Sequence, residues 1–467
     1  FICEPVACAK QEWYNSFLEY WNTAYCGKGS TVQDGNTGGG NVGRKSSGRI
    51  LIGYDLGEDY AQISYYLPAG EDVETLAVVA GSEQYSIPMV LCRRGEANQW
   101  LYGREAAKAA KAQEGDLVEN LLALARKGEE IAVGEESFDP VALLTLFVRR
   151  SLSLLGIVAP LEHLDGVMFT VEHLDERMVD VLSQMAANLQ LKTDRIYFQS
   201  HVDSFYYFTL SQPEPLWAYE VLLCEYDNRK LRLYRFECNR KTTPQVVFIE
   251  TDERKEMKRE ENGDGELPKD GLDDMFSRIV KEKCNGRAVS CVYLIGEGFK
   301  DGWADESLHY LCRGRRVFQG NNLYSKGACY GICEKLGWRE AKTGYVFLGR
   351  DKLTANVGMR LLRRGTDSYF AIMDGGINWY EADREFDVVM ESGDTVGVLL
   401  TPLNGGDPRE ILMVLEGLPQ RADWTTRLRV RAQMLTRTQL RLKVSDMGFG
   451  DFFPSSGAEW EKRIELV

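Results

Sequence analysis

Histidine is scarce in this chain, with four among 467 residues. So few imidazoles argue against a histidine-rich metal site, and we expect no metal held by protein side chains alone. The sequence also lacks an uninterrupted apolar run of about 18 residues, the length a membrane-spanning helix needs, so we expect no membrane insertion. Basic residues are outnumbered, with 56 Lys and Arg against 70 Asp and Glu and a net charge of −14. A surface this acidic repels a phosphate backbone, which argues against general nucleic-acid binding.

Two further signatures are absent. The eleven cysteines are scattered and form no Cys-x-x-Cys pair, so we expect reduced, mostly buried thiols. The first residues do not show the basic start, apolar stretch and small-residue cleavage site of a signal peptide. Together these absences favour a cytoplasmic location. His201, near Asp203 and Ser204, would suit a hydrolase, but no Gly-x-Ser-x-Gly nucleophile elbow is present.

What the chain does contain is enough apolar material for a folded core. Hydrophobic residues make up 44% of the sequence and aromatic residues 11%. These values exclude a disordered or collagen-like chain. At about 150 residues per domain, the length predicts two to three domains.

The first 48 residues differ in composition from the rest. Residues 1–26 contain three cysteines and an aromatic cluster, and residues 27–48 contain eight glycines among Ser, Thr and Asn. The second segment has the composition of a flexible linker. Residues 1–26 are therefore expected to be an N-terminal appendage. Two interpretations stay open, namely an expression fusion or disordered tail, and a tethered peptide that docks on a partner or on the rest of the chain.

Residues 49–344 alternate strand and helix patterns, which predicts an α/β domain. A buried run at 50–57 followed by an alternating run at 61–67 predicts a hairpin. A second hairpin is predicted from runs at 221–226 and 230–236, with its turn at Asp227-Asn228. Strand and helix signals thus alternate from one hairpin to the next.

Residues 345–467 change to alternating strands, which predicts an all-β domain. Arg427, Arg429 and Arg431 alternate with apolar residues and are most simply the solvated face of one strand. Asp374-Gly375-Gly376 could be a phosphate loop, but a hairpin turn is the simpler interpretation. The alternation in this segment predicts two half-buried antiparallel strands joined near Thr436.

The first predicted hairpin carries a family resemblance. Its turn, Asp55-Leu56-Gly57, resembles the first phosphate loop of the actin-like ATPase superfamily, which includes sugar kinases and the seventy-kilodalton heat-shock chaperones. Such a turn offers backbone N–H groups to phosphates, and Gly57 permits close approach. By this resemblance, Asp55 would orient a hydrated magnesium ion.

Other segments resemble the chaperones in the same order along the chain. Gly296-Glu297-Gly298 follows a predicted strand and resembles the adenosine motif, although it could be only a tight strand–helix turn. Residues 319–328 are similar to the family's closing Gly-Ala helix. Residues 440–450 resemble a strand and turn of the chaperones' substrate-binding β-sandwich.

The chain therefore resembles a divergent member of the heat-shock chaperone branch. The resemblance implies an α/β, actin-like two-lobed nucleotide-binding fold at 49–344 and a β-sandwich at 345–467. It implies ATP or ADP with magnesium as ligand, and a protein or peptide client and a co-chaperone as partners. The nucleotide-binding residues it implies are Asp55, Leu56, Gly57, Asp227, Gly296, Glu297 and Gly298.

Departures from the family pattern argue against turnover. The turn that matches the second phosphate loop contains no glycine, and Glu58 and Asp59 add carboxylates that repel a triphosphate. The family's catalytic lysine aligns near Leu124 or Ala125, with Arg126 and Lys127 adjacent, and the sequence leaves open whether either basic residue substitutes for it. Phosphoryl transfer depends on positioning and electrostatics, so we expect at most a weak ATPase.

Two functions remain after this comparison, with a sugar-kinase-like enzyme third. The first is a lidless chaperone-like protein with a degenerate nucleotide site, and the second is a non-enzymatic scaffold that has lost the nucleotide. The second hairpin turn discriminates between them. If Asp227 and Asn228 can vacate the phosphate site, binding survives, whereas Arg229 or Lys230 filling that site favours the scaffold. The acidic stretch at 250–274 lacks calcium-loop spacing and is expected to be a solvated loop or helix face.

Overall fold

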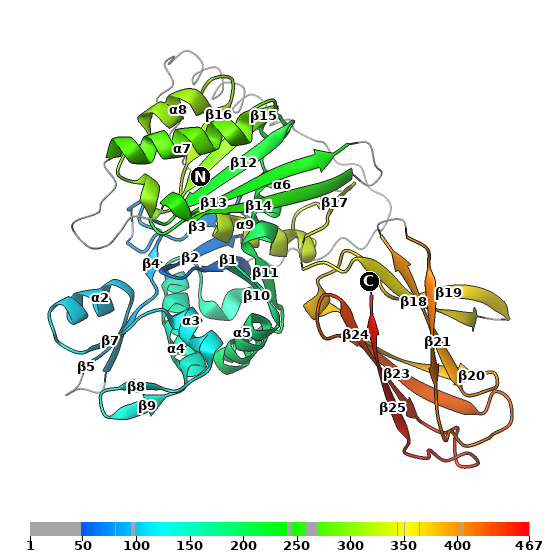
Figure 1. Cartoon of the computed structure of the whole chain (residues 1–467). Coiled ribbons are helices and arrows are strands. Elements are labelled where there is room, and N and C mark those ends of the chain that lie inside the picture. Colours follow the sequence, from blue (N-terminus) through cyan, green and yellow to red (C-terminus); the bar gives the residue numbers. More distant parts are fainter. Residues whose placement is uncertain are drawn as a thin grey trace, which may run out of the picture.

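The computed structural model describes residues 48–466 apart from 80, 95–98, 241–244, 258–268, 343, 350, 364 and 404–405. The expected appendage at 1–26 and all of the expected linker except Gly48 lie outside the described residues. The described chain is a mixed α/β structure with several sheets (Figure 1).

The first large sheet contains both strands of the first predicted hairpin. Its order is β11-β10-β1-β2-β3, with β4 also paired to β2. Strands β1 and β2 are antiparallel, whereas β10 and β11 run parallel to β1. The predicted hairpin is thus confirmed, with Leu56 opposite Ala61 at its tip. The strands are β1 (Ile50–Leu56), β2 (Tyr60–Tyr66), β3 (Glu74–Thr75), β4 (Ile87–Pro88), β10 (Leu164–Val171) and β11 (Ile196–Ser200).

The second large sheet repeats this topology. Its order is β16-β15-β12-β13-β14-β17, and again a three-stranded antiparallel unit, β12 to β14, is followed by two strands parallel to the first. The second predicted hairpin is also confirmed, with Tyr226 opposite Leu231. The strands are β12 (Glu220–Tyr226), β13 (Leu231–Asn239), β14 (Gln245–Arg254), β15 (Val289–Ile295), β16 (Arg316–Gln319) and β17 (Tyr345–Phe347).

The two sheets and their helices stack in layers (Figure 1). Helices α4 and α5 cover the outer face of the first sheet, and α7 and α8 cover the outer face of the second. Helices α6 and α9 lie between the sheets, where Phe205, Phe208 and Ile332 join one core with Leu51 and Leu223. The helices are α2 (Gly103–Lys111), α3 (Leu121–Lys127), α4 (Pro140–Leu152), α5 (Glu176–Leu189), α6 (His201–Ser211), α7 (Lys269–Cys284), α8 (Asp305–Leu311) and α9 (Leu323–Lys335).

Helix α4 begins where its sequence signal predicts a helix start. The Asp139 carboxylate accepts hydrogen bonds from the backbone N–H groups of Val141 and Ala142, and Pro140 occupies the first turn. Residues Pro140–Ile157 are long and apolar enough, by length and composition alone, to cross a membrane. Arg149 and Arg150 interrupt this window, which is why it contains no uninterrupted apolar run of that length. More than half of the window is buried inside the structure, as in a core helix.

The remaining strands of the α/β part form small sheets beside α2. The three-stranded sheet has the order β6-β5-β7, and β8 and β9 form a separate hairpin. These strands are β5 (Leu91–Arg94), β6 (Gln99–Tyr102), β7 (Asp116–Val118), β8 (Ile131–Val133) and β9 (Glu136–Phe138).

After β17, the described chain forms two four-stranded antiparallel sheets around a shared core. Their orders are β19-β18-β21-β22 and β20-β23-β24-β25, and inward-facing residues such as Val398, Val430 and Leu442 are buried. The strands are β18 (Ala355–Arg363), β19 (Thr366–Met373), β20 (Asp383–Met390), β21 (Thr395–Pro402), β22 (Arg409–Val414), β23 (Thr426–Met434), β24 (Gln439–Asp446) and β25 (Glu459–Glu465). Arg429 and Arg431 lie on an exposed face and pair with Asp387 and Asp383.

Three expectations need correction. Asp374-Gly375-Gly376 is not a hairpin turn, because β19 ends before it and the chain passes through a short 3₁₀ helix, Trp379–Glu381, into the other sheet. The expected boundary at 344 precedes β17, whose pairing with β14 extends the second large sheet to Phe347. In the stretch at 250–274, expected to be a solvated loop or helix face, residues 250–254 instead belong to strand β14, while residues 269–274 lie in α7. The strand carboxylates Asp252 and Glu253 pair with Arg254, Lys255 and Lys283.

The described cysteines agree with the expectation of free thiols. None of the eight forms a disulfide, and six of them are buried. Burial raises the pKa of Cys224 and Cys329 above the ordinary thiol value. These thiols therefore behave as small apolar side chains of the core.

Close backbone contact brings the central helices together. A Cβ atom added to Gly327 of α9 would lie 2.0 Å from the backbone oxygen of Ser204 in α6. Glycine is therefore required where α9 crosses α6. A neighbouring requirement exists at Gly53 of β1, where an added Cβ would lie 2.2 Å from the backbone of Cys329.

We expect Gly327→Ala to lower the free energy of unfolding by at least about 2 kcal/mol, because neither backbone can move aside without disturbing the core between the sheets. Chemical denaturation of the full chain measures this loss. Gly156→Ala is the matched control, since an added Cβ there meets nothing within 4 Å. Equal stability of the two variants would contradict the close approach.

Candidate functional site

Most of the predicted nucleotide-binding residues lie in one cleft between the two hairpin turns. A cavity of about 680 Å³ lies there. It is lined by the β1–β2 turn, the β12–β13 turn, the end of β15 and the first turns of α6 and α9. Six of the seven predicted nucleotide-binding residues line it, namely Asp55, Leu56, Gly57, Asp227, Gly296 and Glu297.

Gly298, the seventh predicted residue, lies beneath the cavity wall and does not line it. Gly296 and Gly298 both pack against Tyr226, where added Cβ atoms would lie 2.2 Å from its backbone oxygen and 2.3 Å from its ring. Gly296 also has φ of 103°, which favours glycine. The packing of the β15 end on β12 is therefore sufficient to explain this glycine pair.

The carboxylate of Asp55 is held by a histidine. Asp55 Oδ1 lies 2.8 Å from His201 Nε2, and the two residues are only 7% and 4% exposed. The His201 ring stacks on Tyr324 with centroids 3.9 Å apart. Burial alone would lower the pKa of His201, but Asp55, with help from Glu225 and Glu172, raises it above the ordinary value. Asp55 thus has His201 as its partner inside the protein, where the family resemblance assigns it a hydrated magnesium ion.

A second chain of contacts begins at the same tyrosine. The Tyr324 hydroxyl donates to Glu225 Oε2 at 2.8 Å, and Arg232 Nε donates to the same oxygen at 3.1 Å. Arg232 Nη1 also donates to Asp227 Oδ2 at 2.9 Å. Burial would lower the pKa of Arg232, but Glu225, Glu172 and Asp227 raise it, so its charge is retained.

The β12–β13 turn uses its own carboxylate to bind its backbone donors. Asp227 Oδ1 accepts hydrogen bonds from the backbone N–H groups of Arg229 and Lys230, each at 2.9 Å. Asn228 completes the turn with a left-handed φ of 67°. A phosphate-binding loop must offer such N–H groups to its ligand. At this turn the Asp227 carboxylate already accepts the hydrogen bonds that a bound phosphate would accept.

At the tip of the first hairpin, one backbone N–H group is also hydrogen-bonded within the protein. The N–H group of Gly57 donates to the Tyr60 oxygen at 3.0 Å. The carboxylates of Glu58 and Asp59 follow directly in the turn. One backbone donor at the first tip and two at the second are therefore already bonded within the protein.

Basic side chains of the second turn cross to carboxylates of the first sheet. Arg229 lies 3.4 Å from Glu58 and 3.1 Å from Asp59. Lys230 lies 3.3 Å from Glu172, at the end of β10. Burial would raise the pKa of Glu172, but a hydrogen bond with His173 and the charges of Arg232, His201 and Lys230 lower it well below its usual range.

The two basic residues near the aligned catalytic position diverge. Arg126 lines the cavity and pairs with Asp175, the residue that caps α5. Lys127 pairs with Glu129 at 2.7 Å and does not line the cavity. The only arginine from α3 in the cleft is thus engaged by a neighbouring helix cap.

Sequence reasoning missed the residues that join the cleft, namely Glu172, His201, Arg232 and Tyr324. His201 was considered for a hydrolase with Asp203 and Ser204, but that group does not assemble. Asp203 forms a capping box with Ser200 at the start of α6, and Ser204 bonds Thr170. The available signal was position, because Glu172 and His201 directly follow strands of the first sheet.

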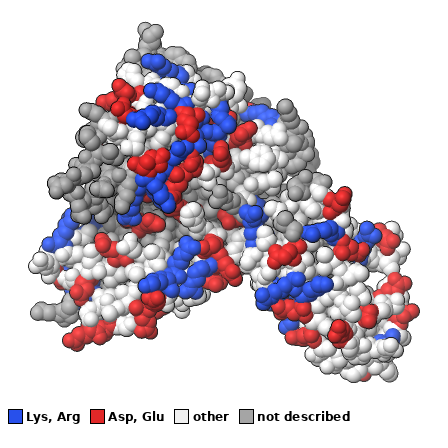
Figure 2. Space-filling view, in the orientation of Figure 1, with Lys and Arg blue, Asp and Glu red and all other residues white. Residues whose placement is uncertain are grey.

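The charged residues around the cleft alternate in sign. Figure 2 shows acidic and basic side chains interspersed on the visible face, without a continuous basic surface. Among the described residues, no group of three or more His, Cys, Asp and Glu has the arrangement of a metal site.

The sequence matches two families over most of its length. Residues 72–350 match the family described as "Family of unknown function (DUF5716) C-terminal", which is more than half of the chain. The chain belongs to the DUF5716 family. Residues 352–466 match "Domain of unknown function (DUF8552)", so the two matches meet at residue 351, after β17. The DUF5716 match contains the second hairpin and most of the cleft but not Asp55. No curated protein matches the sequence.

We expect Asp55→Asn to destabilise the protein by about 3 kcal/mol near pH 6, since it leaves a buried His201 cation without its partner. The pKa of His201 is raised in the folded state. Stability from this pair is therefore fully present below the unfolded pKa of about 6.5 and is lost as pH rises through the folded value. The loss should be smaller near pH 9, as measured by denaturant unfolding at both pH values.

The surface pair Arg429–Asp387 provides the control. Asp387→Asn should cost less than about 1 kcal/mol and show no such dependence between these pH values. A loss for Asp55→Asn that stays constant or grows with pH would contradict the assignment of a protonated His201.

Proposed function

We propose that this chain is a non-hydrolysing relative of the actin-like ATPases of the heat-shock chaperone branch, and that it acts as an interaction protein. In this proposal the cleft is a structural joint between two lobes. The all-β part, a β-sandwich in this interpretation, contacts a protein partner. The observation that carries the proposal is the β12–β13 turn, where Asp227 binds the backbone donors that a phosphate would need.

The topology supports the two-lobed part of the proposal. Two sheets with the same strand order face each other across α6 and α9, and each contributes a hairpin turn to the cleft. An actin-like fold has two lobes with a cleft between them. The predicted site residues also meet in one place, although they come from β1, β12 and β15.

The ion pairs across the cleft support the loss of nucleotide chemistry. Arg229 and Lys230 of the second lobe meet Glu58, Asp59 and Glu172 of the first. The Arg229 pairs are half-exposed, and each is worth at most about 1 kcal/mol because of solvent screening. These pairs matter because they lie inside the cleft. A nucleotide phosphate would have to displace Arg229 and would then be repelled by the carboxylates of Glu58 and Asp59.

An exposed apolar face supports the interaction role. In β22, Leu412 and Val414 are 56% and 55% exposed, and Tyr369 of β19 and Leu362 of β18 are also exposed in the same sheet. Apolar side chains gathered on one face are typical of protein interaction surfaces. This face belongs to the all-β part, away from the cleft residues.

A second candidate is weak nucleotide binding without turnover. The cavity of about 680 Å³ favours it, because a space of this size suits a small-molecule ligand. In that case the base and ribose would occupy the side of the cavity formed by Gly296 and Glu297, and the phosphates would have to displace Arg229.

Thermal unfolding of the full chain with millimolar Mg-ATP or Mg-ADP tests the proposal. We expect no rise in the melting temperature and no release of inorganic phosphate. A ligand at 100 times its dissociation constant would add about 2.7 kcal/mol of stability, so binding would be readily seen.

The variant Asp55→Ala and its surface control Asp387→Ala complete this test. A nucleotide-dependent rise that persists in Asp387→Ala and disappears in Asp55→Ala would establish the second candidate. Phosphate release by the parent chain that disappears in Asp55→Ala would overturn the non-hydrolysing proposal altogether.

A further inference from the structure

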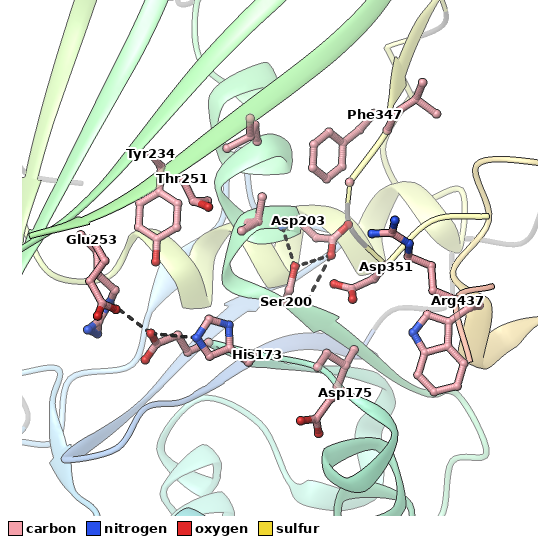
Figure 3. Close-up of a pocket in the computed structure, with 18 of the residues that line it drawn as sticks. His173, Asp175, Ser200, Asp203, Tyr234, Thr251, Glu253, Phe347, Asp351 and Arg437 are labelled. Atoms are coloured by element: carbon pink, nitrogen blue, oxygen red, sulfur yellow. Dashed lines mark hydrogen bonds and ion pairs between the residues drawn. The ribbon is translucent and has the colours of Figure 1, made fainter. Parts of the chain in front are cut away.

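One end of the all-β part is attached to the α/β part. A second cavity, of about 590 Å³, lies at this junction and is shown in Figure 3. Beside it, the Tyr380 hydroxyl donates to the Phe198 oxygen at 2.9 Å, and Lys352 lies 3.2 Å from Asp203 of α6. These contacts come from the segment after β17 and the 3₁₀ helix Trp379–Glu381. The outward-facing sides of the two four-stranded sheets remain open to solvent.

The outward-facing side of the sheet β20-β23-β24-β25 is charged. Arginine and lysine side chains of β23 and β24 form ion pairs there with carboxylates of β20 and β25. Val389 of β20 is an apolar residue on this side, and it is 42% exposed. Because its charges are paired and solvated, this side is suited to contact with water.

The outward-facing side of the sheet β19-β18-β21-β22 is apolar instead, and we call it the apolar face. Each of its four strands contributes to it, because outward positions alternate with buried ones along the strands. A continuous apolar surface of this kind is typical of an interaction site. The outward-facing large apolar residues are Leu362, Tyr369, Leu399, Leu412 and Val414.

Two glycines of the inner strands make the apolar face flat. A Cβ atom added to Gly358 of β18 would lie 2.3 Å from the Tyr369 ring, so this ring from the edge strand β19 lies over β18. A Cβ atom added to Gly397 of β21 would lie 3.3 Å from Leu412 and 2.9 Å from Glu410. Side chains of both edge strands therefore lie across the inner strands, and glycine at such positions permits close approach of another surface.

The apolar face also contains opposite charges. Arg360 of β18 lies opposite Tyr369 in register, and Glu410 of β22 lies opposite Leu399. Both residues are exposed, and neither forms an ion pair with the part of the chain that the structure describes. A two-fold axis would bring the arginine of one protomer to the glutamate of its partner, and the reverse pair would form at the same time.

These properties favour a second copy of the chain over an unrelated protein. Interfaces between permanent partners are more apolar than those of transient complexes, and homodimers are the commonest soluble oligomers. A flat sheet surface packs well on another flat sheet surface at about 10 Å. The second copy offers both the flat apolar surface and the complementary charges.

We propose that two copies of this chain associate face to face through the apolar face, with Arg360 of each protomer paired with Glu410 of its partner. This inference rests on the proposed function, in which the all-β part contacts a protein, and it names that protein as a second copy. The interface contains none of the residues that line the cleft.

Sedimentation velocity of the full chain, over about a hundredfold range of concentration up to the high micromolar range, tests this proposal. We expect a dimer whose fraction rises with concentration. A chain that stays monomeric throughout overturns the proposal and leaves the apolar face to a different protein. The interaction role in the proposed function would survive that result, and the thermal test with nucleotide is independent of it.

Leu412→Asp locates the interface on the apolar face. We expect it to weaken dimerisation by at least about tenfold, because a carboxylate would be buried in an apolar contact without a partner. Val389→Asp on the charged side of the other sheet is the matched control and should leave the dimer unchanged. Both residues are about half exposed, so both variants should fold, which their melting temperatures verify. Equal dimerisation of the two variants would overturn the proposal.

Charge reversal tests the pairing between the protomers. Arg360→Glu alone and Glu410→Arg alone should each weaken dimerisation by at least about tenfold, because like charges would then meet across the interface. The double variant should restore the parent's affinity, because both pairs form again with reversed polarity. A double variant that dimerises no better than the single variants would overturn the proposed face-to-face arrangement.

Discussion

The buried contact between Asp55 and His201 is the interaction on which the cleft depends. A carboxylate at the tip of β1 would be costly to bury alone, and a charged imidazole at the start of α6 would be equally costly. Because the two side chains lie 2.8 Å apart, their attraction offsets the cost of removing each of them from water. His201 also stacks on Tyr324, and the Tyr324 hydroxyl and Arg232 both donate to Glu225. One continuous set of contacts therefore connects the two hairpins.

Under the proposed function, this arrangement would explain how a cleft of the actin-like type can persist without a nucleotide. Phosphates in such a cleft would attract backbone N–H groups and basic side chains from both lobes. Here carboxylates of the chain itself occupy those roles, with Asp227 on the donors of its own turn and Glu172 beside Lys230 and Arg232. These carboxylates belong to the chain, so in the proposed function the two sheets would need no ligand to remain together.

The sequence predicted local structure well and side-chain partners poorly. Both hairpins and the start of α4 follow from patterns within a dozen residues, where alternation, turn residues and an Asp-Pro cap determine the outcome. The strand β14 was missed because its last residues, which include Glu250, Asp252 and Glu253, resemble the polar stretch that follows, while its pairs with β13 join residues 7 to 23 positions apart. The prediction of a hairpin turn at Asp374-Gly375-Gly376 was wrong for a similar reason. Tertiary packing, which local sequence does not show, places the next strand in the other sheet. For the site, the glycines and Asp55 could be located, since they resemble motifs, but His201 and Tyr324 lie 146 and 99 residues from their partners and no local signal marks them.

The two cavities share Glu172, His173 and Arg232, and this overlap links the cleft to the junction with the all-β part. Arg232 directs its guanidinium to Glu225 and Asp227 on one side, while its neighbour on β13, Tyr234, lines the other cavity. A change of charge at Glu172 would therefore change the electrostatic potential in both cavities.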